Sequence, residues 1–140
     1  MNPYEAYRTA DRNVNLDDKP LVLLKVYQAL LEKIEAVKYA IENQDYLVKD
    51  RELSKITTAI EILDNSLDYS YGEIPKNLSG LYVYLLRRLR SIQFSLDIKS
   101  LDECKTLLTK IYEGFEGAYE KEKRKQSNQT QTIRPSFIKI

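Results

Sequence analysis

The sequence predicts an all-α protein, an antiparallel up-down four-helix bundle with a short N-terminal arm or helix and a flexible C-terminal tail. Apolar residues recur at alternating spacings of three and four over long stretches, as they do on one face of a helix. Only four glycines and four prolines interrupt 140 residues, of which 43% are hydrophobic, so long unbroken helices are expected. We divide the chain into an arm (1–19), the helical bundle (20–125) and a tail (126–140).

The first helix is predicted to start at Pro20, because proline suits a first helical position, where its missing N–H has no partner to lose. Asp17 and Asp18 precede it, where negative charge favours the helix dipole. The break is expected at residues 43–45. The predicted inward positions are Leu23, Tyr27, Leu30, Ile34, Val37 and Ile41.

The second helix is expected over residues 48–69. Its inward positions follow the same alternation and are Leu53, Ile56, Ile60, Leu63 and Leu67. Gly72 suits a left-handed cap after this helix. Pro75 does not fit a helix interior, so residues 71–75 should separate the second helix from the third.

The third helix is expected over residues 76–96 and the fourth from Ser100 to about residue 125. Ser100 and Glu103 match a capping box, in which each side chain satisfies a backbone N–H of the other residue. The inward positions of these two helices are predicted to be Leu78, Leu81, Tyr82, Leu85, Leu89, Ile92, Leu96, Leu101, Cys104, Leu108, Ile111, Phe115 and Ala118. Connections are short, so neighbouring helices should pack antiparallel.

The composition argues against an enzyme, a metal centre and a bound cofactor. The chain has no histidine and one cysteine, Cys104, and it carries no glycine-rich phosphate loop. Histidine-dependent catalysis and histidine or cysteine metal clusters are thereby excluded. The acidic residues fall mostly between the apolar stripes, which is typical of a solvated face.

Charge and hydropathy limit which partners and which cellular compartment are expected. The net charge is only +1, so a general nucleic-acid binder is not expected, and we interpret Arg87, Arg88 and Arg90 as a solvated face. The longest apolar run, residues 81–86, is six residues long, far short of the roughly 20 that span a membrane. The N-terminus lacks the apolar stretch of a signal peptide. A cytoplasmic protein without membrane insertion is expected.

Apolar residues also lie outside the inward stripes. They are Leu21, Leu24, Leu31, Tyr39, Ile62, Tyr69, Val83, Tyr84, Leu86, Phe94, Leu107 and Tyr112. Such extra positions are consistent with a groove that accepts an amphipathic helix, or simply with wider buried stripes. Gly114 and Gly117 in the fourth helix predict a close approach, by a neighbouring helix or by a bound peptide.

The N-terminal arm carries two tyrosines three residues apart, Tyr4 and Tyr7. One interpretation is a packed or frayed terminus. The other is a lid, in which both side chains cover the groove until a partner displaces them.

Three motifs resemble the flagellar secretion chaperones that bind flagellin. The opening Asn-Pro-Tyr-Glu-Ala-Tyr is similar to the N-terminal arm of that family, and Leu-Leu-Lys-Val-Tyr at 23–27 to its first helix. The most specific match is Asn-Leu-x-x-Leu-Tyr-x-Tyr-x-x-x-Arg-Leu, which begins at Asn77 and ends at Leu89.

The resemblance implies a non-enzymatic cytosolic bundle that binds the disordered C-terminal segment of flagellin. Such a protein prevents premature polymerisation and delivers flagellin to the export apparatus, with the export gate as a further partner. The residues expected to form the flagellin groove are Leu24, Tyr27, Leu31, Ile62, Tyr69, Leu78, Leu81, Tyr82 and Leu85, with Tyr4 and Tyr7 as the lid. The alternative function is a generic helical adaptor or dimerisation module.

Overall fold

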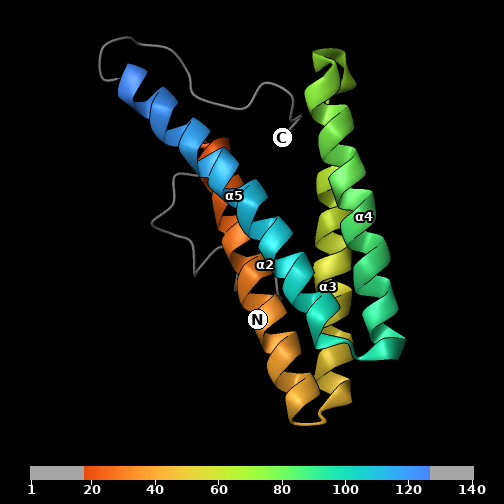
Figure 1. Cartoon of the computed structure of the whole chain (residues 1–140). Coiled ribbons are helices and arrows are strands. Elements are labelled where there is room, and N and C mark those ends of the chain that lie inside the picture. The colour runs from red at the N-terminus through yellow and green to blue at the C-terminus, as the bar shows by residue number, and fades with distance from the viewer. Residues whose placement is uncertain (1–17, 127–140) are drawn as a thin grey trace, which may run out of the picture.

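The computed structural model describes residues 18–126 and is all-helical over that range. Its α-helices are α2 (Lys19–Glu42), α3 (Tyr46–Asn65), α4 (Glu73–Ser95) and α5 (Ile98–Gln126), with a short 3₁₀ turn, η1 (Tyr69–Tyr71), before α4. Consecutive helices run antiparallel (Figure 1). Helix α2 packs on α3 and α5, and α4 packs on the same two helices. The predicted up-down four-helix bundle is confirmed.

The bundle opens toward one end. Figure 1 shows that α5 begins beside α4 and then runs along α2, while α4 runs along α3. The first half of α4 and the second half of α5 therefore diverge. This divergence creates the site described below.

The core follows the predicted stripes closely. Its fully buried large side chains include Tyr27, Ile34, Ile56, Ile60, Tyr82, Leu85, Leu89, Ile92, Leu101 and Leu108. Four predicted positions differ. Leu81 and Ala118, expected inside, are exposed, Leu81 at 38%. Leu24 and Leu86, expected outside the inward stripes, are buried, at 6% and 7% exposed. The divergence of α4 and α5 accounts for the first two, because it uncovers the flanks that carry Leu81 and Ala118.

A pair of tyrosines lies at the centre of this core. The hydroxyl groups of Tyr27 on α2 and Tyr82 on α4 are hydrogen-bonded to each other. The ring of Phe115 on α5 stacks on Tyr27 with a centroid separation of 5.5 Å. Burial raises the pKa of Tyr82 to about 12. Two contacts of Tyr27 thus join three helices, and the buried hydroxyls of Tyr27 and Tyr82 are hydrogen-bonded, as buried polar groups usually are.

Ion pairs join the outer surfaces of neighbouring helices. Lys33 on α2 lies 3.1 Å from Glu52 on α3. Burial is the largest single influence and raises the pKa of the Glu52 carboxyl. The hydrogen bond and charge of Lys33, with smaller contributions from Lys55 and Arg51, together outweigh burial, so the pKa is lowered.

One lysine, Lys49, is buried, which the sequence patterns do not anticipate. Lys49 on α3 is 3% exposed. Its Nζ donates a hydrogen bond of 2.9 Å to the carbonyl oxygen of Gln93 in the last turn of α4. It also lies 2.7 Å from the carboxylate of Asp50. A cation at a helix C-terminus interacts favourably with the helix dipole, so Lys49 ties the start of α3 to the end of α4.

Helix ends differ from prediction in three places. Helix α3 ends at Asn65 rather than near residue 69, and Pro75 lies in the first turn of α4, where its missing N–H costs nothing. The predicted capping box at Ser100 is wrong. Asp97 accepts hydrogen bonds from the Lys99 backbone N–H (3.0 Å) and the Ser100 hydroxyl (2.9 Å), and so caps α5 three residues earlier.

Candidate functional site

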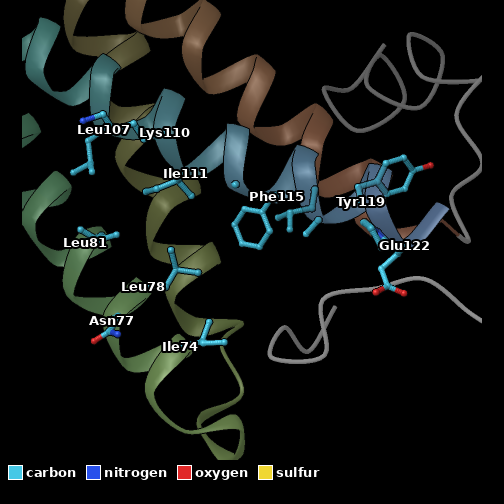
Figure 2. Close-up of a pocket in the computed structure, with 14 residues that line it drawn as sticks. Ile74, Asn77, Leu78, Leu81, Leu107, Lys110, Ile111, Phe115, Tyr119 and Glu122 are labelled. Carbon is cyan, nitrogen blue, oxygen red and sulfur yellow. The ribbon is translucent and has the colours of Figure 1, made fainter. Parts of the chain in front are cut away.

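An open groove lies between the first half of α4 and the second half of α5, with the start of α2 at its end. Its volume is about 740 Å³. Figure 2 shows side chains of α4 and α5 facing each other across it. The lining residues are Pro20, Leu23, Ile74, Asn77, Leu78, Leu81, Leu107, Lys110, Ile111, Gly114, Phe115, Ala118, Tyr119 and Glu122. Most of these side chains are apolar, so the groove favours an apolar occupant.

The two glycines of α5 leave space rather than receive a neighbouring helix. A Cβ atom added at Gly114 or Gly117 would meet no atom within 4 Å. The predicted close approach of a neighbouring helix is therefore wrong. Gly114 lines the groove and Gly117 does not. A glycine inside a helix costs about 1 kcal/mol relative to alanine, and the space beside Gly114 is open on the groove side of α5.

The polar groups of the groove are placed near its ends. At the end beside α2, the Tyr119 hydroxyl donates a hydrogen bond of 2.9 Å to Asp18. The same carboxylate accepts a hydrogen bond from the backbone N–H of Leu21 (3.3 Å) and so caps α2. Burial, and then this hydrogen bond to Asp18, raise the pKa of Tyr119. The contact fixes one end of the groove wall against the start of α2.

On the outer side of α4, Tyr84 and Arg88 bind one carboxylate of α5. The Tyr84 hydroxyl donates to Glu103, and Arg88 donates to the other carboxylate oxygen at 2.6 Å. These hydrogen bonds, first that from Tyr84 and then that from Arg88, lower the pKa of Glu103. The tyrosine and arginine of the α4 motif therefore hold α5 against α4 at the closed end of the bundle.

The arginine cluster is partly used within the fold. Arg88 pairs with Glu103, and Arg90 pairs with Glu61 on α3. Both guanidinium groups are engaged by carboxylates of neighbouring helices, which supports the interpretation of this cluster as a structural, solvated face.

Of the nine predicted groove residues, two line the observed groove. Leu78 is buried at its floor and Leu81 is exposed on its α4 wall. Four others, Leu24, Tyr27, Tyr82 and Leu85, are buried in the core. They shape the bundle and offer almost no surface to a partner.

The remaining three lie elsewhere. Ile62 and Tyr69 are exposed, at 61% and 51%, outside the groove. Leu31 is partly buried against the core. The proposed lid residues Tyr4 and Tyr7 lie outside the described residues, and the lid stays a prediction.

Several lining residues were not predicted for the groove. Ile74 lies in the segment 71–75, which is predicted to separate two helices. Ile111 and Phe115 are predicted for the core, and Leu107 is predicted only as an apolar residue outside the inward stripes. The apolar periodicity of α5 does not reveal the groove residues on this helix. The same pattern continues from the first half, which packs on α4, into the second half, which lines the groove.

Two further features concern metal ions and membranes. No group of three or more metal-binding side chains occurs among residues 18–126. Within the same range, no helix is both long and apolar enough to cross a membrane.

Comparison with known proteins gives consistent matches. The sequence model of the family described as flagellar protein FliS matches residues 1–122. The flagellar secretion chaperone FliS of Bacillus subtilis is 28% identical over 124 residues, covering 89% of this chain and 91% of the relative. FliS of Salmonella typhimurium is 38% identical over 80 residues, covering 54% and 57%. The flagellar secretion chaperone FliSB of Pseudomonas aeruginosa is 32% identical over 91 residues, covering 64% and 72%.

Proposed function

The chain belongs to the FliS family of flagellar proteins, and from this membership we propose that it is a cytoplasmic export chaperone for flagellin. It binds the C-terminal segment of flagellin, prevents premature polymerisation and delivers flagellin to the export apparatus. This is the role of a chaperone and involves no catalysed reaction.

The open apolar groove between α4 and α5 carries this proposal. Residues 107–122 of α5 form one wall, which corresponds to roughly 22 Å, or about four helical turns, at 1.5 Å per residue. An amphipathic helix of about that length buries its apolar face in such a groove. A segment that folds as it binds also covers a large surface while the cost of ordering moderates its affinity.

We assign a second contact surface to exposed apolar residues of α3, η1 and α4. They are Ile62 on α3, Tyr69 and Tyr71 on η1, and Val83 on α4. Tyrosine is enriched at protein interfaces because its ring is apolar and its hydroxyl remains hydrogen-bonded. A flagellin segment longer than the groove would continue over this surface. Ile62 and Tyr69, both predicted for the groove, would then contact flagellin outside it.

The flagellar export gate is the further partner that we propose. Flagellin occupies the open end of the bundle in this proposal. Figure 1 shows the α2–α3 and α4–α5 connections at the opposite, closed end. In this proposal that end is left free for the export gate.

Calorimetry with intact flagellin and with flagellin lacking its C-terminal segment tests the proposal. Intact flagellin should bind and the truncated form should not. Leu81→Asp, in the groove wall, should weaken binding at least about tenfold by placing a charge against apolar surface. Leu47→Asp is the matched control, since Leu47 is exposed near the opposite end of the bundle. Equal binding of both flagellin forms would contradict the proposal, as would equal effects of the two substitutions.

A further inference from the structure

The described part of α5 ends beside the open groove. Glu122 lines the groove, and α5 ends at Gln126, one helical turn later. Residues 127–140 follow, outside both the described residues and the 1–122 range that the family model matches. This segment, which we call the tail segment, therefore starts at the mouth of the groove.

The tail segment has two parts of different chemistry. Residues 127–132 are all polar, and residues 133–140 read Ile-Arg-Pro-Ser-Phe-Ile-Lys-Ile. Ile133, Phe137 and Ile140 are spaced four and three apart, the spacing of one helical face. The only proline, Pro135, falls near the start of this stretch, where a helix tolerates it.

We propose that residues 133–140 dock in the groove of their own chain and compete there with flagellin. The occupant is thus the tail segment itself, with Ile133, Phe137 and Ile140 as its apolar anchors. Docking does not depend on the proposed function; the competition with flagellin does.

The length of the tail segment permits this arrangement. Six residues, 127–132, span up to about 20 Å when extended, enough to reverse direction at the end of α5. Eight helical residues then extend roughly 12 Å. Running back along α5, they reach the part of the groove wall formed by Phe115 and Ile111.

Charge at the groove mouth does not select the tail segment. Glu122, which lines the mouth, lies 3.6 Å from Lys125, and exposed Glu73 lies 3.7 Å from Lys76. The tail segment contains Arg134 and Lys139 and no acidic residue. Its apolar anchors and its length, rather than ion pairs, therefore favour docking.

Tethering makes even weak docking effective. A short flexible linker gives an effective concentration in the millimolar range. If the free tail segment bound with a dissociation constant of about 0.1 mM, the groove would be closed roughly ten times more often than open. The apparent affinity for flagellin falls by the same factor, because only the open fraction binds.

The experiment compares five chains, each with an intact bundle. They are the full chain, a deletion of residues 127–140, the triple variant Ile133→Ser/Phe137→Ser/Ile140→Ser, a control triple variant Ser127→Ala/Asn128→Ala/Thr130→Ala, and a deletion of residues 1–15. Groove exposure is measured with the apolar fluorescent dye ANS. Flagellin affinity is measured by calorimetry. Sedimentation velocity gives the oligomeric state.

The deletion of 127–140 and the apolar-to-serine variant should both raise ANS fluorescence and strengthen flagellin binding about tenfold, while the control triple variant matches the full chain. ANS fluorescence unchanged by either tail variant would overturn the proposal. So would a rise seen only on deletion of residues 1–15, which would identify the arm as the occupant. A dimer lost on deletion of 127–140 would also overturn it, because the tail segment would then occupy a second copy. A tail effect on ANS without flagellin binding by any chain would support docking and contradict the flagellin function instead.

Discussion

At the scale of single residues, the fold depends on a few polar side chains that are satisfied inside or at the edge of the core. Tyr27 and Tyr82 bond to each other, Lys49 bonds to the end of α4, and Asp18 joins Tyr119 to the start of α2. Each of these links two helices. Buried polar groups are costly when a partner is removed, so these residues should be sensitive to substitutions that leave the apolar core unchanged.

Tyr82→Phe should lower the free energy of unfolding by about 1–3 kcal/mol, because the Tyr27 hydroxyl then loses its hydrogen-bond partner in the core. Urea unfolding monitored by circular dichroism measures this loss. Tyr39→Phe serves as the control, since the Tyr39 side chain on α2 is 70% exposed. In the Tyr82→Phe protein, the further substitution Tyr27→Phe should lower the free energy of unfolding by less than Tyr27→Phe does in the wild type, because the two hydroxyls form one pair. Simple additivity would show that the pair is not coupled.

The Lys33–Glu52 contact predicts a pH dependence of stability. The pKa of Glu52 is lowered in the folded protein, so the stabilisation is present above the unfolded-state pKa and is lost as pH falls through the folded-state pKa. The wild type should therefore lose more stability below about pH 5 than Glu52→Gln does. Urea midpoints measured from pH 7 to pH 3 test this. Parallel curves for the two proteins would contradict the assignment.

At the scale of elements, α5 has two functions along its length. Its first half is covered by α4 through contacts such as Glu103 with Arg88, and its second half lines the groove. The same apolar stripe serves the core in one half and a partner in the other. The glycines lie in the second half, where α5 faces no neighbour at Gly114 or Gly117.

Alanine substitutions at these glycines separate stability from binding. Both Gly114→Ala and Gly117→Ala should raise the free energy of unfolding by up to about 1 kcal/mol, because alanine is the better helix former and the added methyl group meets no atom. Gly114→Ala should also weaken flagellin binding several-fold, since Gly114 lines the groove, whereas Gly117→Ala should not. Thermal unfolding and calorimetry provide the two measurements. Equal binding by both variants would place the flagellin segment elsewhere.

At the scale of the whole molecule, the bundle is closed at one end and open at the other. Helices α2 and α5 lie together, as do α3 and α4, and the two pairs diverge toward one end (Figure 1). An apolar groove without a partner among the described residues is energetically unfavourable in water. A flagellin segment that fills it should therefore stabilise the entire bundle.

The midpoint of thermal unfolding should rise with the concentration of a flagellin C-terminal peptide. A ligand that binds only the folded state stabilises it by about 2.7 kcal/mol at a hundredfold excess over its dissociation constant. Differential scanning calorimetry measures the rise. Leu81→Asp should abolish it and Leu47→Asp should retain it. A peptide that raises the midpoint of both variants equally would bind outside the groove.

The number, order and direction of the helices were determined by the sequence alone, because the periodicity of Leu, Ile and Tyr leaves one possible buried face per helix over long uninterrupted stretches. The sequence motif of α4 also indicates the family without any knowledge of the tertiary structure. Tertiary structure alone decided which flank of each helix is covered. Leu24 lies outside the inward stripe of its helix and Leu81 lies on that of its own, yet Leu24 is buried and Leu81 lines the groove. The difference arises from the divergence of α4 and α5, which depends on contacts between residues far apart in the chain and so leaves no mark on local spacing.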